Sequence, residues 1–257
     1  MSLFSSPAQL KQLESLLHIF ARLPFAAGAI PGAVLEASLA SVRGAVVLPT
    51  YDFVDVLDPA RQIGWQVKAT KAGTPLTWKR VKLPNGASLI PGSQADNALA
   101  QELGRQILEF CNEHARASLD LKVKPKNRTA LLGPKVRLDE IGIARLIVHP
   151  NGTAQYYERR LITRGSPQLF DPAQYRWHWG SERSGGRQLA ALQGLQASTG
   201  SKHFAWHGQG ENQLHFPGEA EWQQDPQATR TTFRLDGKRL SHADLQRMIV
   251  WLDSAPS

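Results

Sequence analysis

The amino-acid sequence predicts an α/β protein in which helices flank a mixed central β-sheet, with additional C-terminal β-rich elements. Apolar residues recur at helical spacing over 7–23, 32–42 and 94–114, which predicts three amphipathic helices. Residues 45–70 are rich in valine, isoleucine and aromatic side chains, which predicts strands between the second and third helices. An apolar run over 141–149 predicts a further, buried strand.

The expected helices begin and end at residues with matching local chemistry. Pro7 stands in the first turn of the first helix, where a missing backbone N–H costs nothing. Gly44 ends the second helix, and Ser93 is the expected N-cap of the third. The apolar stripe of the third helix includes Cys111, for which inert packing is the expectation.

Turn residues divide the β-rich segments into strands. Asp58-Pro59-Ala60-Arg61 separates 45–57 from 62–70 and predicts a β-hairpin. Pro150-Asn151-Gly152 predicts a second hairpin between 141–149 and 154–162.

The C-terminal part lacks a clear hydrophobic period, because Gly, Gln, Trp, His and Arg are interspersed along it. Short strands are expected over 203–206, 213–216 and 231–235. Ser241 is expected to cap a last helix that runs to about residue 252.

The charge of the chain favours a polyanionic partner. Its 257 residues include 30 Lys and Arg against 22 Asp and Glu, a net charge of +8. Two stretches, 68–82 and 122–137, contain several basic residues and no acidic one. Nucleic acid or an anionic membrane surface would suit such a balance. The alternative is a solvated basic surface that serves solubility.

Other features favour a cytoplasmic protein without a membrane segment. The richest apolar stretch, 26–35, is broken by Pro31 and is shorter than the roughly 20 residues that a spanning helix needs. The first residues lack the pattern of a secretory signal. A single cysteine excludes an intrachain disulfide and makes a cysteine-built zinc site improbable.

The predicted hairpin brings together residues that suit a hard cation. Strand alternation places Asp52 on the same face as Gln66 and Lys68, and Asp55 on the other face. A carboxylate and an amide oxygen at cross-strand separation suit Mg²⁺, and the ammonium beside them suits a scissile phosphate. A bulge in the first strand would exchange the places of Asp52 and Asp55. The simpler alternative is an ordinary cross-strand ion pair between Asp52 and Lys68, which contributes little.

At these residues the chain resembles the PD-(D/E)XK nuclease superfamily. There an acidic residue on one strand precedes an acid-x-Lys on the next, and here Gln66-Val67-Lys68 stands in that place. The order of helix, two strands, helix and strand over about residues 30–150 is similar to the family core, and Glu36 stands where many members have a helical glutamate. Two departures are Tyr51 in the place of the family's proline and the neutral Gln66, which some restriction endonucleases of the family share.

The resemblance implies a Mg²⁺-dependent type II restriction-like endonuclease that hydrolyses double-stranded DNA and works as a homodimer. It implies catalytic roles for Asp52, Gln66, Lys68 and Glu36, and metal binding by Asp52, Gln66 and Glu36, with Asp55 as the alternative ligand. The expected division is a nuclease core over 1–165 and a recognition region over 166–257, which could also be part of the same domain. The expected DNA-binding residues are Lys71, Lys79, Arg80, Lys124, Lys126, Arg128, Arg176, Arg183 and Arg187.

Several alternatives remain open. The chain could be a repair, phage or junction-resolving nuclease of the same superfamily, or a DNA-binding protein without catalysis. Taken alone, a glutamate such as Glu36 is more often a solvated helix residue than a ligand. The segment 177–187 is either a DNA-contacting segment or a flexible surface loop. His203, His207 and His215 are expected on the surface or at the DNA backbone, because strands between them remove the spacing that a helical zinc site needs.

Overall fold

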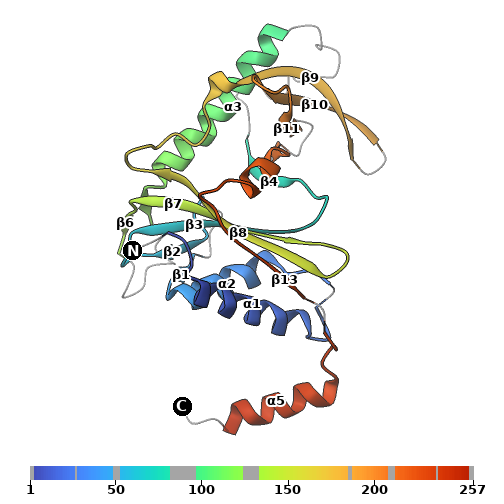
Figure 1. Ribbon diagram of the computed structural model, residues 1–257. Coiled ribbons are helices and arrows are strands. Elements are labelled where there is room, and N and C mark those ends of the chain that lie inside the picture. Colours follow the sequence, from blue (N-terminus) through green and yellow to red (C-terminus); the bar gives the residue numbers. More distant parts are fainter. Residues whose placement is uncertain are drawn as a thin grey trace. The chain divides into compact units, whose positions relative to one another are not determined.

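The computed structural model describes residues 3–26, 28–48, 53–81, 97–123, 133–184, 187–207, 212–235 and 237–254 (Figure 1). The chain divides into two compact units, each built from separated segments. The first unit comprises Met1–Thr74, Gly142–Arg159 and Thr229–Ser257, and the second comprises Pro75–Ile141 and Arg160–Ala228. Residue 165 is therefore not a boundary between these two compact units. The division into a cutting region and a recognition region stays a prediction. No helix in the described part of the chain is both long and apolar enough to cross a membrane.

A six-stranded sheet with the order β1-β2-β3-β7-β8-β13 forms the centre of the first unit. Its strands are β1 (Val46–Val47), β2 (Val56–Asp58), β3 (Ile63–Lys71), β7 (Glu140–Val148), β8 (Thr153–Thr163) and β13 (Thr229–Arg234). The helices of this unit are α1 (Pro7–Ala21), α2 (Gly32–Arg43) and α5 (His242–Ser254). In Figure 1, α1 and α2 lie side by side against this sheet, and their apolar faces join its side chains in one core. The α/β class, the mixed central sheet and its flanking helices are thus confirmed.

The helices of the first unit begin and end much as the sequence predicts. The Ser6 hydroxyl accepts from the Gln9 N–H, and the Gln9 side chain accepts from the Ser6 N–H, which is a capping box. Gly44 ends α2 in the left-handed conformation with φ of 63°. Ser241 caps α5 by accepting from the Asp244 N–H at 3.1 Å.

A buried carboxylate fastens the start of the chain to the sheet. Glu158 on β8 is fully buried, and it accepts from the Ser5 N–H and the Ser5 hydroxyl, both at 2.6 Å. It also accepts from the Tyr156 hydroxyl at 2.7 Å. Burial raises the pKa of Tyr156 well above its usual value, and the neighbouring Glu158 charge adds to the shift. These three bonds supply the partners that a buried carboxylate requires.

The prediction of a single strand over 45–57 is wrong. In place of one strand over 45–57, the chain forms β1 and β2, which pair antiparallel with Val46 opposite Leu57. The Leu48 N–H donates to the Asp55 carbonyl at 2.8 Å, so the chain reverses between these two short strands. The turn at 58–61 is confirmed, because Asp58 pairs with Ile63 and its carboxylate accepts from the Arg61 N–H.

The second unit contains a five-stranded antiparallel sheet with the order β4-β12-β11-β10-β9. Its strands are β4 (Leu76–Arg80), β9 (Tyr175–Ser184), β10 (Arg187–Gln196), β11 (Lys202–His207) and β12 (Gln213–Phe216). A small ribbon joins β5 (Asp120–Lys122) to β6 (Lys135–Arg137), and the helical elements are α3 (Asn97–Ala117), η3 (Pro172–Gln174) and α4 (Glu219–Gln223).

Two expectations about this part of the chain are corrected. Residues 177–184 and 187 lie in β9 and β10, which pair without interruption from Arg187–Ser184 to Gln196–Tyr175, so they do not form a flexible loop. The long helix is confirmed as α3, but it belongs to the second unit, where it packs against β9 and β10. Its expected cap, Ser93, lies outside the described residues.

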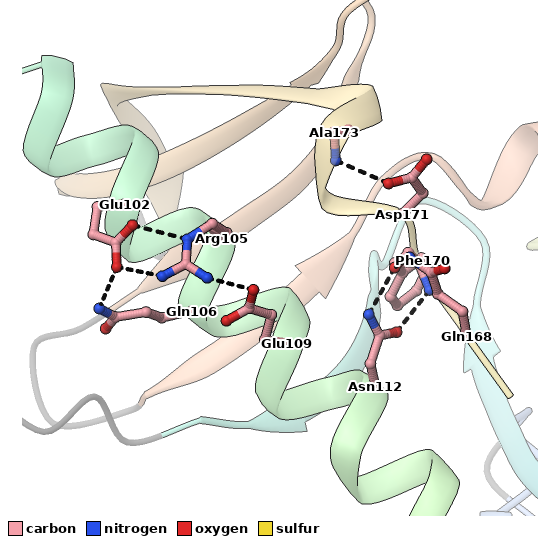
Figure 2. A network of polar contacts seen from close by, with 9 residues as sticks. All are labelled: Glu102, Arg105, Gln106, Glu109, Asn112, Gln168, Phe170, Asp171 and Ala173. Carbon is pink, nitrogen blue, oxygen red and sulfur yellow. Dashed lines mark hydrogen bonds and ion pairs between the residues drawn. The ribbon is translucent and has the colours of Figure 1, made fainter.

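An aromatic core fills one side of the five-stranded sheet, and α3 holds one of its central rings. The Asn112 side chain of α3 donates to the Phe170 carbonyl at 2.7 Å and accepts from the Phe170 N–H at 2.8 Å (Figure 2). The Phe170 ring contacts Trp78, Phe204 and Trp222. Along the same helix Arg105 bridges Glu102 and Glu109. The helix therefore fixes the packing of the sheet through one buried amide.

Candidate functional site

Asp55 forms two hydrogen bonds with β3, one to the residue on each side of Gln66. Its N–H donates to the Trp65 carbonyl at 2.9 Å, and its carboxylate oxygen Oδ2 accepts from the Val67 N–H at 2.7 Å. The pairs of β2 and β3 run from Asp58–Ile63 to Val56–Trp65, and Asp55 directly precedes this paired stretch. Asp55 is half-buried. The carboxylate thus lies at the point where β2 meets β3.

The hydrogen bonds of Asp55 place it beside Gln66 at the edge of the paired stretch of β2 and β3. The face of the sheet expected for each of Asp52 and Asp55 stays a prediction. Asp52 lies outside the described residues, and its role as a ligand stays a prediction.

Gln66 carries a buried oxygen that lacks a partner. Its neighbours Trp65 and Val67 belong to the core beneath α1 and α2, so the Gln66 side chain points to the opposite face of the sheet. The residue is 4 % exposed. Its Oε1 atom has no hydrogen-bond partner within the described part of the chain. A buried amide oxygen without a partner costs free energy, and a cation would satisfy it.

Glu36 and Lys68 interact electrostatically across α2 and β3. Burial raises the pKa of the half-buried Glu36 above its usual value, and the positive charge of Lys68 lowers it in part. The charges of Glu36 and Lys68 are therefore close enough to interact, and the role of Glu36 as a metal ligand stays a prediction. A cation beside Glu36 would offset the remaining cost of its charge.

Arg145 on β7 is a further residue at this place that the sequence analysis did not single out. It is 1 % exposed, and its Nη2 donates to the Thr70 hydroxyl at 2.8 Å, while Nη1 donates to the Leu146 carbonyl at 2.9 Å. Nη1 also reaches the Lys68 carbonyl at 3.5 Å, the limit of a hydrogen bond. The sequence feature that could have identified it is an arginine inside the apolar run 141–149, because a buried arginine needs hydrogen-bond partners nearby.

The oxygen atoms of this site fit a hard cation in kind. The carboxylate of Asp55 and the amide oxygen of Gln66 are ligands that Mg²⁺ accepts, together with several waters. Glu36 lies on α2, which packs on the face of the sheet that carries Trp65 and Val67. Over the described ranges, no group of three or more His, Cys, Asp or Glu residues is placed to hold a metal ion. The unpartnered Gln66 oxygen is therefore the observation on which the fit rests.

The expected DNA-binding residues are spread over both units. Lys71 is exposed at the end of β3 in the first unit. In the second unit Arg80 and Arg176 are exposed on β4 and β9, and the Lys79 ammonium lies 5.8 Å from the ring centroid of Phe110. The backbones of Arg183 and Arg187 lie near the connection between β9 and β10, where Arg187 pairs with Ser184. Lys124, Lys126 and Arg128 lie outside the described residues.

The histidines of the second unit differ from the expected surface positions in one case. His203 is 4 % exposed, and its Nε2 lies 2.8 Å from the Glu221 carboxylate, so its expected surface position is wrong. His207 and His215 are half-buried, with ring centroids 5.1 Å apart. Gly218 leaves room for the His203 ring, because a Cβ there would lie 2.7 Å from it.

The raised pKa of Glu36 predicts a pH-dependent effect of its removal. A carboxyl group whose pKa is higher in the folded state stabilises the fold below its unfolded pKa, and this contribution is lost as the pH rises through the folded pKa. Glu36→Gln should therefore raise the free energy of unfolding at pH 7 in EDTA, and the gain should vanish toward pH 4. Urea unfolding at several pH values measures this.

The exposed Glu113 of α3 provides the matched control, because Glu113→Gln should leave the free energy of unfolding nearly unchanged. A Glu36→Gln protein that is less stable than the parent at pH 7 would show that Lys68 outweighs the burial of the carboxylate.

Comparisons with protein-family models, with curated proteins and with solved structures returned no significant match to this chain. The resemblance over about residues 30–150 therefore stays a prediction that rests on the residues of the site themselves.

Proposed function

We propose that this protein is a Mg²⁺-dependent endonuclease that hydrolyses phosphodiester bonds of double-stranded DNA at specific sequences, in the manner of a type II restriction enzyme. One observation carries the proposal: the Oε1 atom of Gln66 is buried without a hydrogen-bond partner in the described part of the chain, and Asp55 bonds to the residues on either side of Gln66. An amide oxygen and a carboxylate at neighbouring positions, with an ammonium two residues away, form a set of groups that phosphodiester hydrolysis needs.

Asp55 and Gln66 would hold the metal ion, and Glu36 would add a second carboxylate. Asp52 remains a candidate for the same role. When bound, Mg²⁺ would supply positive charge beside the scissile phosphate and lower the pKa of a water molecule. Because Gln66 is neutral, the carboxylates provide all the negative charge that attracts the ion.

Lys68 would act on the reacting groups. Hydrolysis forms a bond between a water oxygen and phosphorus and breaks the bond from phosphorus to a sugar oxygen; the water loses one proton and the departing oxygen gains one. The Lys68 ammonium would hold the attacking water by a hydrogen bond and stabilise the charge that grows on the phosphate. Arg145 would set the course of β3 at Lys68 through its contacts with the Lys68 carbonyl and Thr70.

The net charge of +8 supports a DNA substrate, and a homodimer would let the enzyme cut both strands. Incubation of the protein with phage and plasmid DNA, in Mg²⁺ or EDTA, tests the proposal through the appearance of discrete bands. Cleavage confined to branched or damaged DNA would instead indicate a repair or junction-resolving nuclease. Binding that is indifferent to Mg²⁺, with no cleavage, would indicate a DNA-binding protein without catalysis.

Lys68→Ala should lower the cleavage rate by about 100-fold or more, because it removes a group that stabilises charge in the transition state. DNA binding, measured by fluorescence anisotropy, should change little. Lys11→Ala on α1 is the matched control, since Lys11 is also a lysine and is exposed far along the chain from the site. A Lys68→Ala enzyme that cuts within a few-fold of the parent would contradict the assignment.

Asp55→Asn should also abolish cleavage, because it removes negative charge from the metal ligands. The asparagine oxygen can still accept from the Val67 N–H, so the fold should be preserved, which circular dichroism can verify. Asp52→Asn is made in parallel. If only Asp52→Asn is inactive, the principal ligand is Asp52 and the position of Asp55 is structural.

Gln66→Ala should weaken Mg²⁺ binding, measured by isothermal titration calorimetry, because it deletes the buried oxygen. Gln66→Glu should bind Mg²⁺ at least as tightly as the parent, since the added charge attracts the ion. Unchanged Mg²⁺ affinity in Gln66→Ala would show that Gln66 is not a ligand.

A further inference from the structure

The five-stranded sheet of the second unit separates its side chains onto two faces of different chemistry. One face carries the aromatic core, which includes Trp177, Phe204 and Phe216. The residues that alternate with these along β9 and β12, and along β11 after Phe204, point to the other face. His203 instead contacts the rings of Tyr175 and Phe216 beside an irregularity in the pairing of β10 with β11. We define this polar face by Arg80, Arg176, His178, Gln193, His207 and His215.

The register of the strands places these residues in rows across the sheet. One row contains His178, Gln193, Ala205 and His215, each paired with the next, and ends at Thr77. The Thr77 hydroxyl lies 3.4 Å from the His215 Nδ1, as expected for neighbours on one face.

The next row begins at Gly180 on β9 and passes through Ala191. It ends with His207, Gln213 and Arg80, which are paired in that order. The His207 and His215 rings are 5.1 Å apart on adjacent strands, which joins the two rows.

The side chains of the polar face could bind both the phosphates and the base edges of a nucleic acid. The imidazole and amide groups of this face both donate and accept hydrogen bonds, and Arg80 and Arg176 are exposed cations. The small residues Ala191 and Ala205 lie between the polar ones and are buried beneath them, so the polar side chains form the surface of this face.

The dimensions of the face suit a duplex. Five strands at about 4.8 Å spacing span roughly 19 Å, and the rows from Arg176 to Arg80 span about 14 Å along the strands. The two arginines therefore lie near opposite corners. A major groove about 12 Å wide would place its flanking phosphates toward such corners and its base edges over the histidines and glutamines.

We propose that the polar face of the five-stranded sheet binds double-stranded DNA, with Arg80 and Arg176 on phosphates and Gln193, His207 and His215 toward the base edges. This inference rests on the proposed function, since it names the surface with which that enzyme would recognise its substrate. Sheets are known to enter DNA grooves, and amide side chains distinguish base edges there.

Histidine footprinting with diethyl pyrocarbonate tests the surface. A 30-base-pair duplex of mixed sequence, added in EDTA so that no cleavage occurs, should lower the modification rates of His178, His207 and His215 at least several-fold. His242, exposed on α5 in the other unit, is the control and should react equally with and without the duplex. Equal modification of all four histidines with and without duplex would overturn the inference. So would failure of the three polar-face histidines to react in the free protein.

Arginine variants provide the second measurement. Arg80→Gln and Arg176→Gln together should make the slope of log affinity against log salt shallower by about 1.8, since each phosphate contact contributes about 0.9. Arg116→Gln, at an exposed position in the last turn of α3, removes a charge elsewhere on the same unit and should leave the slope unchanged. An Arg116→Gln slope that is shallower by about 0.9, half the change of the double variant, would overturn the inference, because binding would then follow total charge alone.

The outcomes separate the surface from the enzyme. An enzyme that cuts DNA while its polar-face histidines stay reactive would keep the proposed function and reject this surface. Protected histidines in a protein that never cleaves DNA would keep the surface and reject the nuclease.

Discussion

The candidate site depends on the double attachment of Asp55 to β3. Its N–H and its carboxylate bond to the residues on either side of Gln66, at 2.9 and 2.7 Å. Without these bonds, only the three paired residues of β2 would hold this part of the chain against β3. The attachment fixes where the chain returns after β1, and it places a carboxylate beside the buried amide. Lys68 follows two residues later on β3, and its charge interacts with that of Glu36 on α2.

The sequence predicts the helices and the second hairpin well, because local signals determine them. Pro7 with Ser6, Gly44 and Ser241 mark helix ends through backbone chemistry that acts within a few residues. The hydrogen bonds of Asp55 to Trp65 and Val67 could not be derived in the same way. They depend on the length of a connection and on a reversal of the chain, and one residue of error moves every side chain to the other face.

The long strands β9 and β10 were missed for a different reason. Their two faces carry aromatic and polar side chains, and Gly180 and Gly194 weaken the alternation that predicts a strand. The structure explains both glycines by close packing. A Cβ at Gly194 would lie 2.9 Å from the Trp177 ring, and one at Gly180 would lie 2.5 Å from the Gln193 side chain. Composition alone cannot separate this pattern from that of a loop.

The path of the chain through the two units limits how the protein can be altered as a set of modules. The boundary between the units falls at Ile141–Gly142 inside β7 and at Arg159–Arg160 inside β8, so both strands continue from one unit into the other. Neither unit is a continuous stretch that can be excised or exchanged by a single fusion. New binding preferences are therefore more easily introduced by substituting side chains on existing strands than by transplanting a domain, and a truncated half of the chain would lack strands that its sheet requires.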